Sequence, residues 1–232
     1  IGAYVGGNVN VTLDGATLTY SGVTPTTGHI FGCNNLNGTP KGHVKVHVKK
    51  TIPVGGQTFD VAAVYGGGNE ADYNPTAADS VEVIIEGCDI TSIKDVYGGG
   101  NAAAVPAAEV WILGTDTIDN VFGGGNGELG ADHAAHVGFH RISASEKSNY
   151  SNGTGKTYVK LVGGHINNVY GGSNSHGDIR GGASISMPQV SEYTATHTGS
   201  PVSCTTLNTK NIYGGGKNAD MSGGTSIVLG CM

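Results

Sequence analysis

Short stretches in which apolar and polar residues alternate recur along the whole chain. In 44–48, for example, Lys45 and His47 separate three valines. Apolar residues at every second position form one apolar face, which is the pattern of a half-buried β-strand. The same alternation appears at 9–13, 81–85, 110–112, 159–161, 185–187 and 227–229. It predicts that six of these side chains point into a core: Val83, Ile85, Val110, Ile112, Val159 and Leu161. A helical pattern is found only in 131–141.

A second repeated element consists of an aliphatic residue, an aromatic residue, glycines and an asparagine. Val64-Tyr65-Gly66-Gly67-Gly68-Asn69 returns at 96–101 and 121–126, and looser copies occupy 30–35, 169–174 and 212–217. The shortest unit, from one aromatic residue at 97 to the next at 122, has 25 residues. That is too short for a propeller blade of about 40–45 residues but fits one coil of a solenoid. The fold is therefore predicted to be all-β, a parallel β-helix (solenoid) of about six to seven coils with loop insertions.

In such a stack, equivalent side chains of successive coils lie above one another at a spacing of about 4.8 Å. The aromatic position predicts a ladder formed by Phe31, Tyr65, Tyr97, Phe122, Tyr170 and Tyr213. The asparagine position predicts a second ladder, with amides bonded from coil to coil, formed by Asn35, Asn69, Asn101, Asn126 and Asn174. Two interpretations of the aromatic residues remain open. They are contacts between coils, which we favour, or a stripe on which sugar rings stack.

These glycine-rich strand repeats resemble right-handed parallel β-helix proteins, in particular adhesin-like surface proteins of Bacteroidales bacteria with Val-Tyr-Gly-Gly-Gly-Asn repeats. The resemblance covers nearly the whole chain. It implies a single-stranded, right-handed solenoid that serves as a non-catalytic adhesin, stalk or scaffold, extracellular or at the cell surface. Because the same fold also carries lyases and hydrolases, a glycan-binding or glycan-cleaving β-helix is the alternative.

The composition restricts the partners. Glycine accounts for 41 of the 232 residues, well above the usual share of about 7%. Charged residues make up 13%, the net charge is −6, and Arg141 and Arg180 are the only arginines, so a nucleic-acid partner is not expected. No apolar run reaches the roughly 18 residues of a membrane-spanning helix. Glycans or proteins of a host or bacterial surface are the expected partners.

The four cysteines are Cys33, Cys88, Cys204 and Cys231, and they form no CxxC motif. Two of them, at 88 and 231, each follow a glycine after a strand and so occupy the same repeat position. They are several coils apart, beyond the limit of about 7 Å for a disulfide. The sequence therefore predicts four free, buried thiols, none of them catalytic.

Insertions at about 127–156 and 188–209 interrupt the repeat. The first contains His133, His136 and His140, which would share one face if 131–141 were helical, as in a three-histidine zinc site. A polar helix against the solenoid is the favoured interpretation. The loops at 66–72 and 214–220 match only isolated copies of a calcium-binding repeat. No cofactor is expected, and calcium or zinc would be incidental.

No residue is assigned a catalytic role. The Gly-His-Gly tract and adjacent aspartates of pectin-cleaving β-helix hydrolases are absent. A pair of carboxylates can perform glycoside hydrolysis, but nothing singles out a pair among Glu82, Glu109, Asp116 and Asp119. Trp111, aligned outward between Ile84 and Lys160, is the best aromatic candidate for stacking on a ligand. The interpretation that the 127–156 insertion covers this ring is favoured over ligand stacking.

The repeat pattern continues to both ends of the sequence. The first residues look like the end of a repeat, and 227–229 look like a strand just begun. Neither end has the polar cap that normally closes a solenoid. We therefore expect one β-helix domain over 1–232 that belongs to a longer chain, with further coils, a partner chain or another domain at one or both ends.

Overall fold

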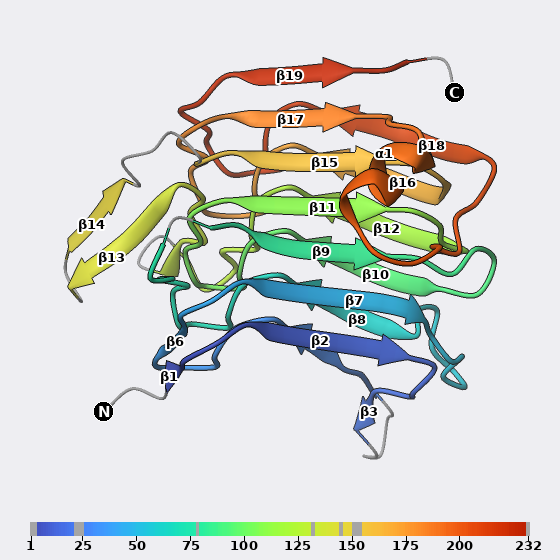
Figure 1. The fold of residues 1–232 in the computed structure, drawn as a ribbon, viewed down its shortest axis with the longest axis horizontal. Coiled ribbons are helices and arrows are strands. Elements are labelled where there is room, and N and C mark those ends of the chain that lie inside the picture. Colours follow the sequence, from blue (N-terminus) through green and yellow to red (C-terminus); the bar gives the residue numbers. More distant parts are fainter. Residues whose placement is uncertain are drawn as a thin grey trace.

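The computed structural model describes residues 4–20, 26–77, 79–130, 133–143, 146–149 and 155–230. These residues are almost entirely β-strands and connecting loops (Figure 1). The one helix that they contain, α1 (Val190–Thr196), has seven residues. The all-β class expected from the alternating pattern is therefore confirmed.

Two large sheets, each built only from parallel neighbours, form the body of the molecule. The seven-stranded sheet contains, in spatial order, β19 (Thr225–Val228), β17 (Ala183–Ser186), β15 (Thr157–Leu161), β11 (Ala108–Ile112), β9 (Val81–Ile85), β7 (Val44–Lys50) and β2 (Val9–Asp14). The six-stranded sheet contains, in spatial order, β18 (Leu207–Tyr213), β16 (Gly164–Tyr170), β12 (Thr117–Phe122), β10 (Ser92–Tyr97), β8 (Val61–Tyr65) and β5 (His29–Phe31).

The chain passes alternately from one large sheet to the other, so strands that are consecutive within a sheet come from consecutive repeats (Figure 1). In the seven-stranded sheet, Val83, Val110 and Val159 are register partners. The prediction that successive repeats pair in parallel is therefore confirmed. A third, two-stranded parallel sheet joins β1 (Tyr4–Val5) to β6 (Thr39–Pro40).

Two antiparallel hairpins lie outside this pattern. One pairs β3 (Thr19–Tyr20) with β4 (Thr26–Thr27), and the other pairs β13 (Phe139–Ser143) with β14 (Glu146–Asn149). The expected helix over 131–141 is therefore wrong, because this stretch ends in a strand and its Val137 forms parallel bridges to Val105 and Ile179. Gly138, at φ +90°, has a backbone conformation that no α-helix accommodates.

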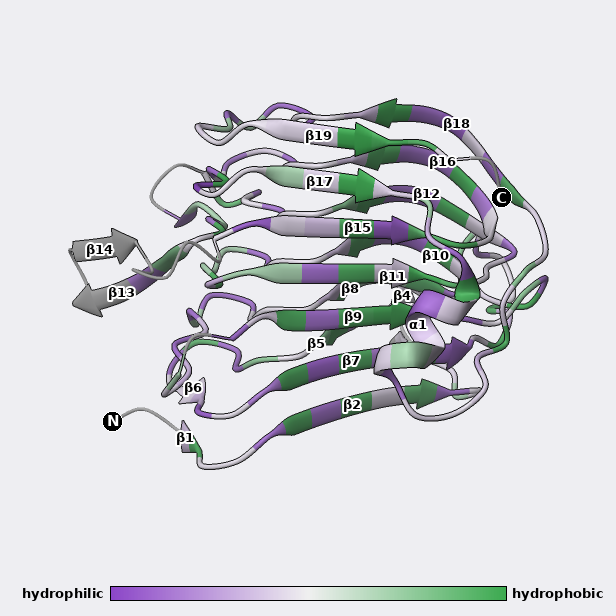
Figure 2. Cartoon of the chain, turned by 45° about the horizontal axis from the view of Figure 1, so that its top comes forward, coloured by the Kyte–Doolittle hydropathy of each residue, from purple (hydrophilic) through white to green (hydrophobic). Residues whose placement is uncertain are grey.

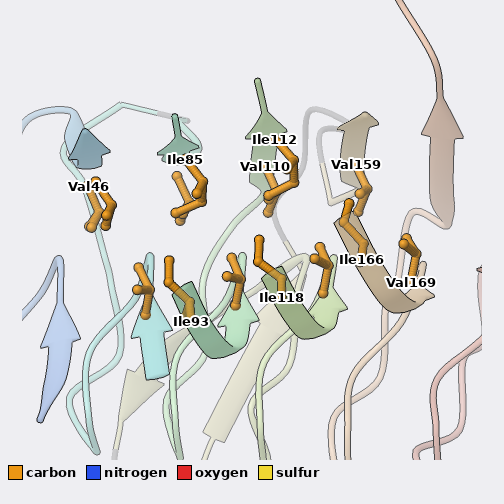
Figure 3. Packing of buried hydrophobic residues seen from close by; sticks show 14 of the residues in the cluster. Val46, Ile85, Ile93, Val110, Ile112, Ile118, Val159, Ile166 and Val169 are labelled. Atoms are coloured by element: carbon orange, nitrogen blue, oxygen red, sulfur yellow. The ribbon is translucent and has the colours of Figure 1, made fainter. Parts of the chain in front are cut away.

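The main hydrophobic core lies between the two large sheets. The labelled aliphatic side chains of the two sheets point toward one another in Figure 3, and the strands carry alternating hydrophobic and hydrophilic bands in Figure 2. All six side chains predicted to point inward have no exposed surface. A second buried cluster, which includes Tyr73, Val105, Val137 and Ile179, lies along the loops on a third side.

The glycine that follows each aromatic residue is required by the close packing of successive repeats. A Cβ atom on Gly98 would clash with the carbonyl oxygen of Gly123, and one on Gly123 would clash with that of Gly171. Neither glycine has a positive φ. The repeated glycine therefore reflects lack of space for a side chain rather than a need for left-handed backbone.

The first prediction concerns this core. Replacing Ile112 by Ala removes a fully buried side chain and should lower the free energy of unfolding by about 2–5 kcal/mol, because a cavity remains between the sheets. Chemical denaturation followed by circular dichroism measures the change. Ile90→Ala is the matched control, since Ile90 is 49% exposed and should lose less than about 0.5 kcal/mol. Equal losses in the two variants would contradict the assigned core.

Candidate functional site

The repeated aromatic residues form a continuous stack on the six-stranded sheet. From Phe31 to Tyr213, neighbouring ring centroids are 4.7–4.9 Å apart and the ring planes differ by 3–11°. Each inner ring therefore has both faces covered by its neighbours, and only its edge and, in the tyrosines, the hydroxyl group are left for other contacts. This geometry leaves no free face on the inner rings for a sugar ring to stack on.

The repeated asparagines also lie in register. The Nδ2 of each donates to the Oδ1 of the asparagine one coil earlier, from Asn174 through Asn126, Asn101 and Asn69 to Asn35, at 2.7–2.9 Å. The last two asparagines of the ladder also contact the aromatic stack. Asn126 donates to the hydroxyl of Tyr65 and Asn174 to that of Tyr97, both at 3.5 Å.

A second polar ladder was missed from the sequence. Asn120 donates to Asp95 at 2.8 Å, Asn168 to Asn120 at 3.1 Å, and Asn211 to Asn168 at 2.9 Å. Each of these residues lies two positions before the aromatic residue of its repeat. The same alignment that reveals the aromatic position therefore contained the signal for this ladder.

The aromatic stack and both polar ladders line a groove of about 350 Å³. Ring edges of Tyr65, Tyr97 and Phe122, amides of both ladders, and five charged side chains face it: Lys94, Asp95, Asp119, Glu128 and Lys217. Burial raises the pKa of Tyr65, Tyr97 and Asp95. The two tyrosines are therefore neutral hydroxyl groups at neutral pH. The groove thus offers hydrogen-bond donors and acceptors, and its aromatic and asparagine positions recur from one repeat to the next.

A carboxylate cluster lies on the outer face of the other large sheet. The carboxylate oxygens of Glu82 lie 3.1 Å from Nζ of Lys45 and 3.9 Å from Nε2 of His43. They also lie 2.5 Å from Nε2 of His197, which belongs to the 188–209 insertion. Asp79 contacts the other side of His43 at 3.1 Å. Burial alone would raise the pKa of Glu82, but the hydrogen bonds with His43 and His197 and the charge of Lys45 outweigh burial and lower it to about 2.

Glu86, four residues after Glu82 and on the same outward face, makes a similar connection. It contacts Nε2 of His47 at 2.6 Å and accepts the backbone N–H of Val202 at 2.6 Å. Burial lowers the pKa of His47. Both buried glutamates therefore join strand β7 to the 188–209 insertion.

Trp111 does not offer a free ring to a ligand. It faces outward as aligned, with register partners Ile84 and Lys160, but it is only 2% exposed. Tyr193 and His197 of the 188–209 insertion cover it edge-on, and the Nζ of Lys160 lies 4.2 Å from its ring. The covering segment is thus this insertion and not 127–156, as the favoured interpretation had it.

The prediction of four free thiols is wrong for two of the cysteines. Cys88 and Cys204 form a disulfide, with Cα atoms 5.2 Å apart and a sequence separation of 116. The insertion carries Cys204 back to the turn after β9, which repeat alignment alone does not reveal. Cys33 is a free thiol whose pKa is raised by burial, and Cys231 lies outside the described residues.

The three histidines of the first insertion do not share a helical face. His133 lies in a turn, His136 accepts the backbone N–H of Asp178 on its Nδ1 at 2.9 Å, and His140 belongs to β13. Among the residues that the structure describes, no group of three or more His, Cys, Asp or Glu side chains is arranged to hold a metal ion.

The acidic residues considered for catalysis separate into two places. Glu82 and Glu109 are register partners on β9 and β11, while Asp116 and Asp119 lie before and within β12 on the six-stranded sheet. Glu109 accepts from Lys160 at 2.6 Å and from the indole of Trp111 at 2.7 Å. The two neighbouring glutamates are thus each engaged by cationic side chains.

No family model, curated protein or solved structure matches this chain. Within the described residues, no helix is both long and apolar enough to cross a membrane.

The asparagine ladder yields the second prediction. Asn126→Ala removes the amide that links Asn101 to Asn174 in a side chain only 4% exposed. The free energy of unfolding should fall by about 1–3 kcal/mol, because the amides of Asn101 and Asn174 are left without this partner. Thermal and chemical unfolding measure it. Asn35→Ala, at the exposed end of the ladder with one ladder bond, should cost clearly less. A reversed order would exclude a stabilising role for the ladder.

The third prediction concerns pH. Because the folded-state pKa of Glu82 is about 2 rather than its ordinary 4.5, its stabilisation is present above pH 4.5 and is lost as the pH falls toward 2. The difference corresponds to about 3 kcal/mol at most. The pKa of His43 is raised, chiefly by Glu82, so its contribution is present below pH 6.5 and is lost as the pH rises through the raised value.

Unfolding free energies between pH 2 and 5 test this assignment. Glu82→Gln should flatten the acid-side slope, whereas Asp14→Asn, an exposed carboxylate paired with Lys49 and Lys50, should leave most of the slope unchanged. Parallel pH profiles for wild type and Glu82→Gln would refute the assignment.

Proposed function

We propose that this chain is a non-catalytic, right-handed parallel β-helix that acts as an adhesin, stalk or scaffold in the extracellular space or at the cell surface. The alternation of the chain between two parallel sheets, with one repeat per layer, supports the solenoid architecture. A parallel connection from one sheet to the next and back is right-handed in nearly all proteins.

The observation that carries the proposal is the uninterrupted stack of six aromatic rings beside two polar ladders. These contacts bind each coil to the next along the whole body. A rigid rod of this kind holds surface loops at fixed distances, which is what a stalk or adhesion module requires.

The Cys88–Cys204 disulfide supports a location outside the cytosol, because disulfides form and persist in oxidising compartments. The low content of charged residues fits the same location. The engagement of Glu82 and Glu109 by lysine and histidine side chains supports a role without turnover. A general acid needs a raised pKa, and that of Glu82 is lowered.

Glycan binding is the second candidate, and the groove on the six-stranded sheet favours it. Its lining offers carboxylates and ammonium groups beside amides and phenol hydroxyls, and the amide and aromatic positions recur from one repeat to the next. A linear, hydroxyl-rich polymer can satisfy such a row with hydrogen bonds from successive sugar units. The recognition would use ring edges and hydroxyls, since the faces of the inner rings are covered.

The fourth prediction tests both candidates with one screen. The purified chain is applied to panels of glycans and extracellular-matrix proteins, and each bound polysaccharide is then assayed for new reducing ends. We expect retention without cleavage. Turnover of any polysaccharide that is lost in Glu82→Gln, Glu109→Gln or Asp119→Asn would overturn the non-catalytic assignment.

A pair of double variants locates the binding surface. Lys94→Ala/Lys217→Ala removes two exposed ammonium groups from the groove and should weaken glycan binding about tenfold or more if the groove is used. Lys49→Ala/Lys50→Ala removes two exposed lysines outside it and should leave binding unchanged. Equal effects of the two would place the binding elsewhere on the molecule.

A further inference from the structure

Residues 189–204, which we call the strap, form a separate layer on the outer face of the seven-stranded sheet. The strap contains α1, which lies outside the two sheets in Figures 1 and 2. Its Tyr193 completes a small buried cluster with four residues of the sheet and its turns: Ile84, Trp111, Leu113 and Val162. No strap residue belongs to the main core between the sheets.

The strap is held mainly at its C-terminal end. Cys204 is bonded to Cys88, and its backbone N–H donates to the carbonyl of Leu113 at 3.0 Å. The N–H of Val202 donates to Glu86, and Gly87 donates to the carbonyl of Val202 at 3.2 Å. The strap backbone passes close to the coils there, because a Cβ atom on Gly163 would clash with Cys204.

Nearer the helix, fewer contacts hold it. His197 pairs with Glu82, and Tyr193 stacks on His197 and meets Trp111 edge-on. Most other side chains between 190 and 200 are exposed. Ordering a backbone costs roughly 1–2 kcal/mol per residue. Between 190 and 200, one buried aromatic side chain and one histidine–glutamate contact do not offset this cost, so the segment depends on its covalent anchor.

We propose that the strap is a thiol-releasable cover over Trp111. While the disulfide is intact, the strap stays on the sheet and the patch formed by Ile84, Trp111, Leu113 and Val162 is closed. When the disulfide is reduced, the strap detaches while the two sheets stay folded. The face that it uncovers is apolar, with Glu109 and Lys160 beside the indole.

The release is an ordinary thiol–disulfide exchange with a dithiol reductant. One reductant thiolate attacks the sulfur of Cys88, which is the more accessible of the two cysteines, and Cys204 leaves as a thiolate. The second reductant thiol then attacks the mixed disulfide, releases Cys88 and closes its own disulfide. Two electrons pass from the reductant to the protein disulfide, and two protein thiols result.

Trp111 is the only tryptophan of the chain, so its fluorescence reports directly on the strap. In the native protein we expect a blue-shifted emission and weak quenching by acrylamide. Addition of dithiothreitol should shift the emission to longer wavelength and raise the quenching constant several-fold, with the β-sheet signal in far-ultraviolet circular dichroism unchanged. Cys88→Ser/Cys204→Ser should show the open state without reductant.

Two variants serve as controls. Cys33→Ser keeps the disulfide and should respond to reductant as the wild type does. Tyr193→Ala with the disulfide intact should increase quenching less than reduction does, because the covalent anchor remains. Unchanged Trp111 quenching after complete reduction would overturn the proposal. Loss of the β-sheet signal together with Trp111 exposure would also overturn it, because the disulfide would then be holding the fold itself.

Discussion

In-register parallel pairing of successive repeats is the constraint on which the rest of the structure depends. Because Val83, Val110 and Val159 are register partners, equivalent positions of successive repeats lie one strand spacing apart. Aromatic residues then stack face to face, and amides bond to amides. The same spacing leaves no room for a side chain after the aromatic residue, where a Cβ atom on Gly98 would meet a backbone carbonyl of the next repeat. The glycine at this position of the repeat therefore follows from the pairing.

The features that repeat were visible in the sequence, and those that depend on an insertion were not. Alternation predicted the buried positions of Val110 and Ile112, and the repeat gave the aromatic and asparagine positions. The ladder through Asp95 and Asn120 had the same signal and was overlooked because its members are not identical. The path of 188–209 is set by contacts with residues more than a hundred positions away, such as Cys88, so no local pattern revealed the disulfide. For the same reason, the sequence predicted the correct face for Trp111 but not that the 188–209 insertion covers it.

Two buried glutamates connect the repeat to the 188–209 insertion. Glu82 and Glu86 lie on the outer face, and each contacts a histidine on one side, His43 just before β7 or His47 within it, and the strap on the other. Burying a carboxylate is costly unless it is paired and hydrogen-bonded. With the disulfide as anchor, these pairs therefore help to define where the insertion lies on the sheet. The cluster gives a non-repeating segment a defined position on a repeating surface.

The two large sheets consequently present surfaces of different character. On the six-stranded sheet, the aromatic and amide positions hold nearly the same side chain in every coil, so any ligand recognised there meets the same groups again after each coil. On the seven-stranded sheet, one outward register position holds His47, Ile84, Trp111, Lys160 and Ser186 in successive coils. A row of five different side chains cannot match a periodic polymer, but it can match one segment of unique sequence, and the strap is such a segment. The groove therefore has the geometry to meet a periodic ligand, whereas the face that the strap covers has the geometry to meet a segment of unique sequence.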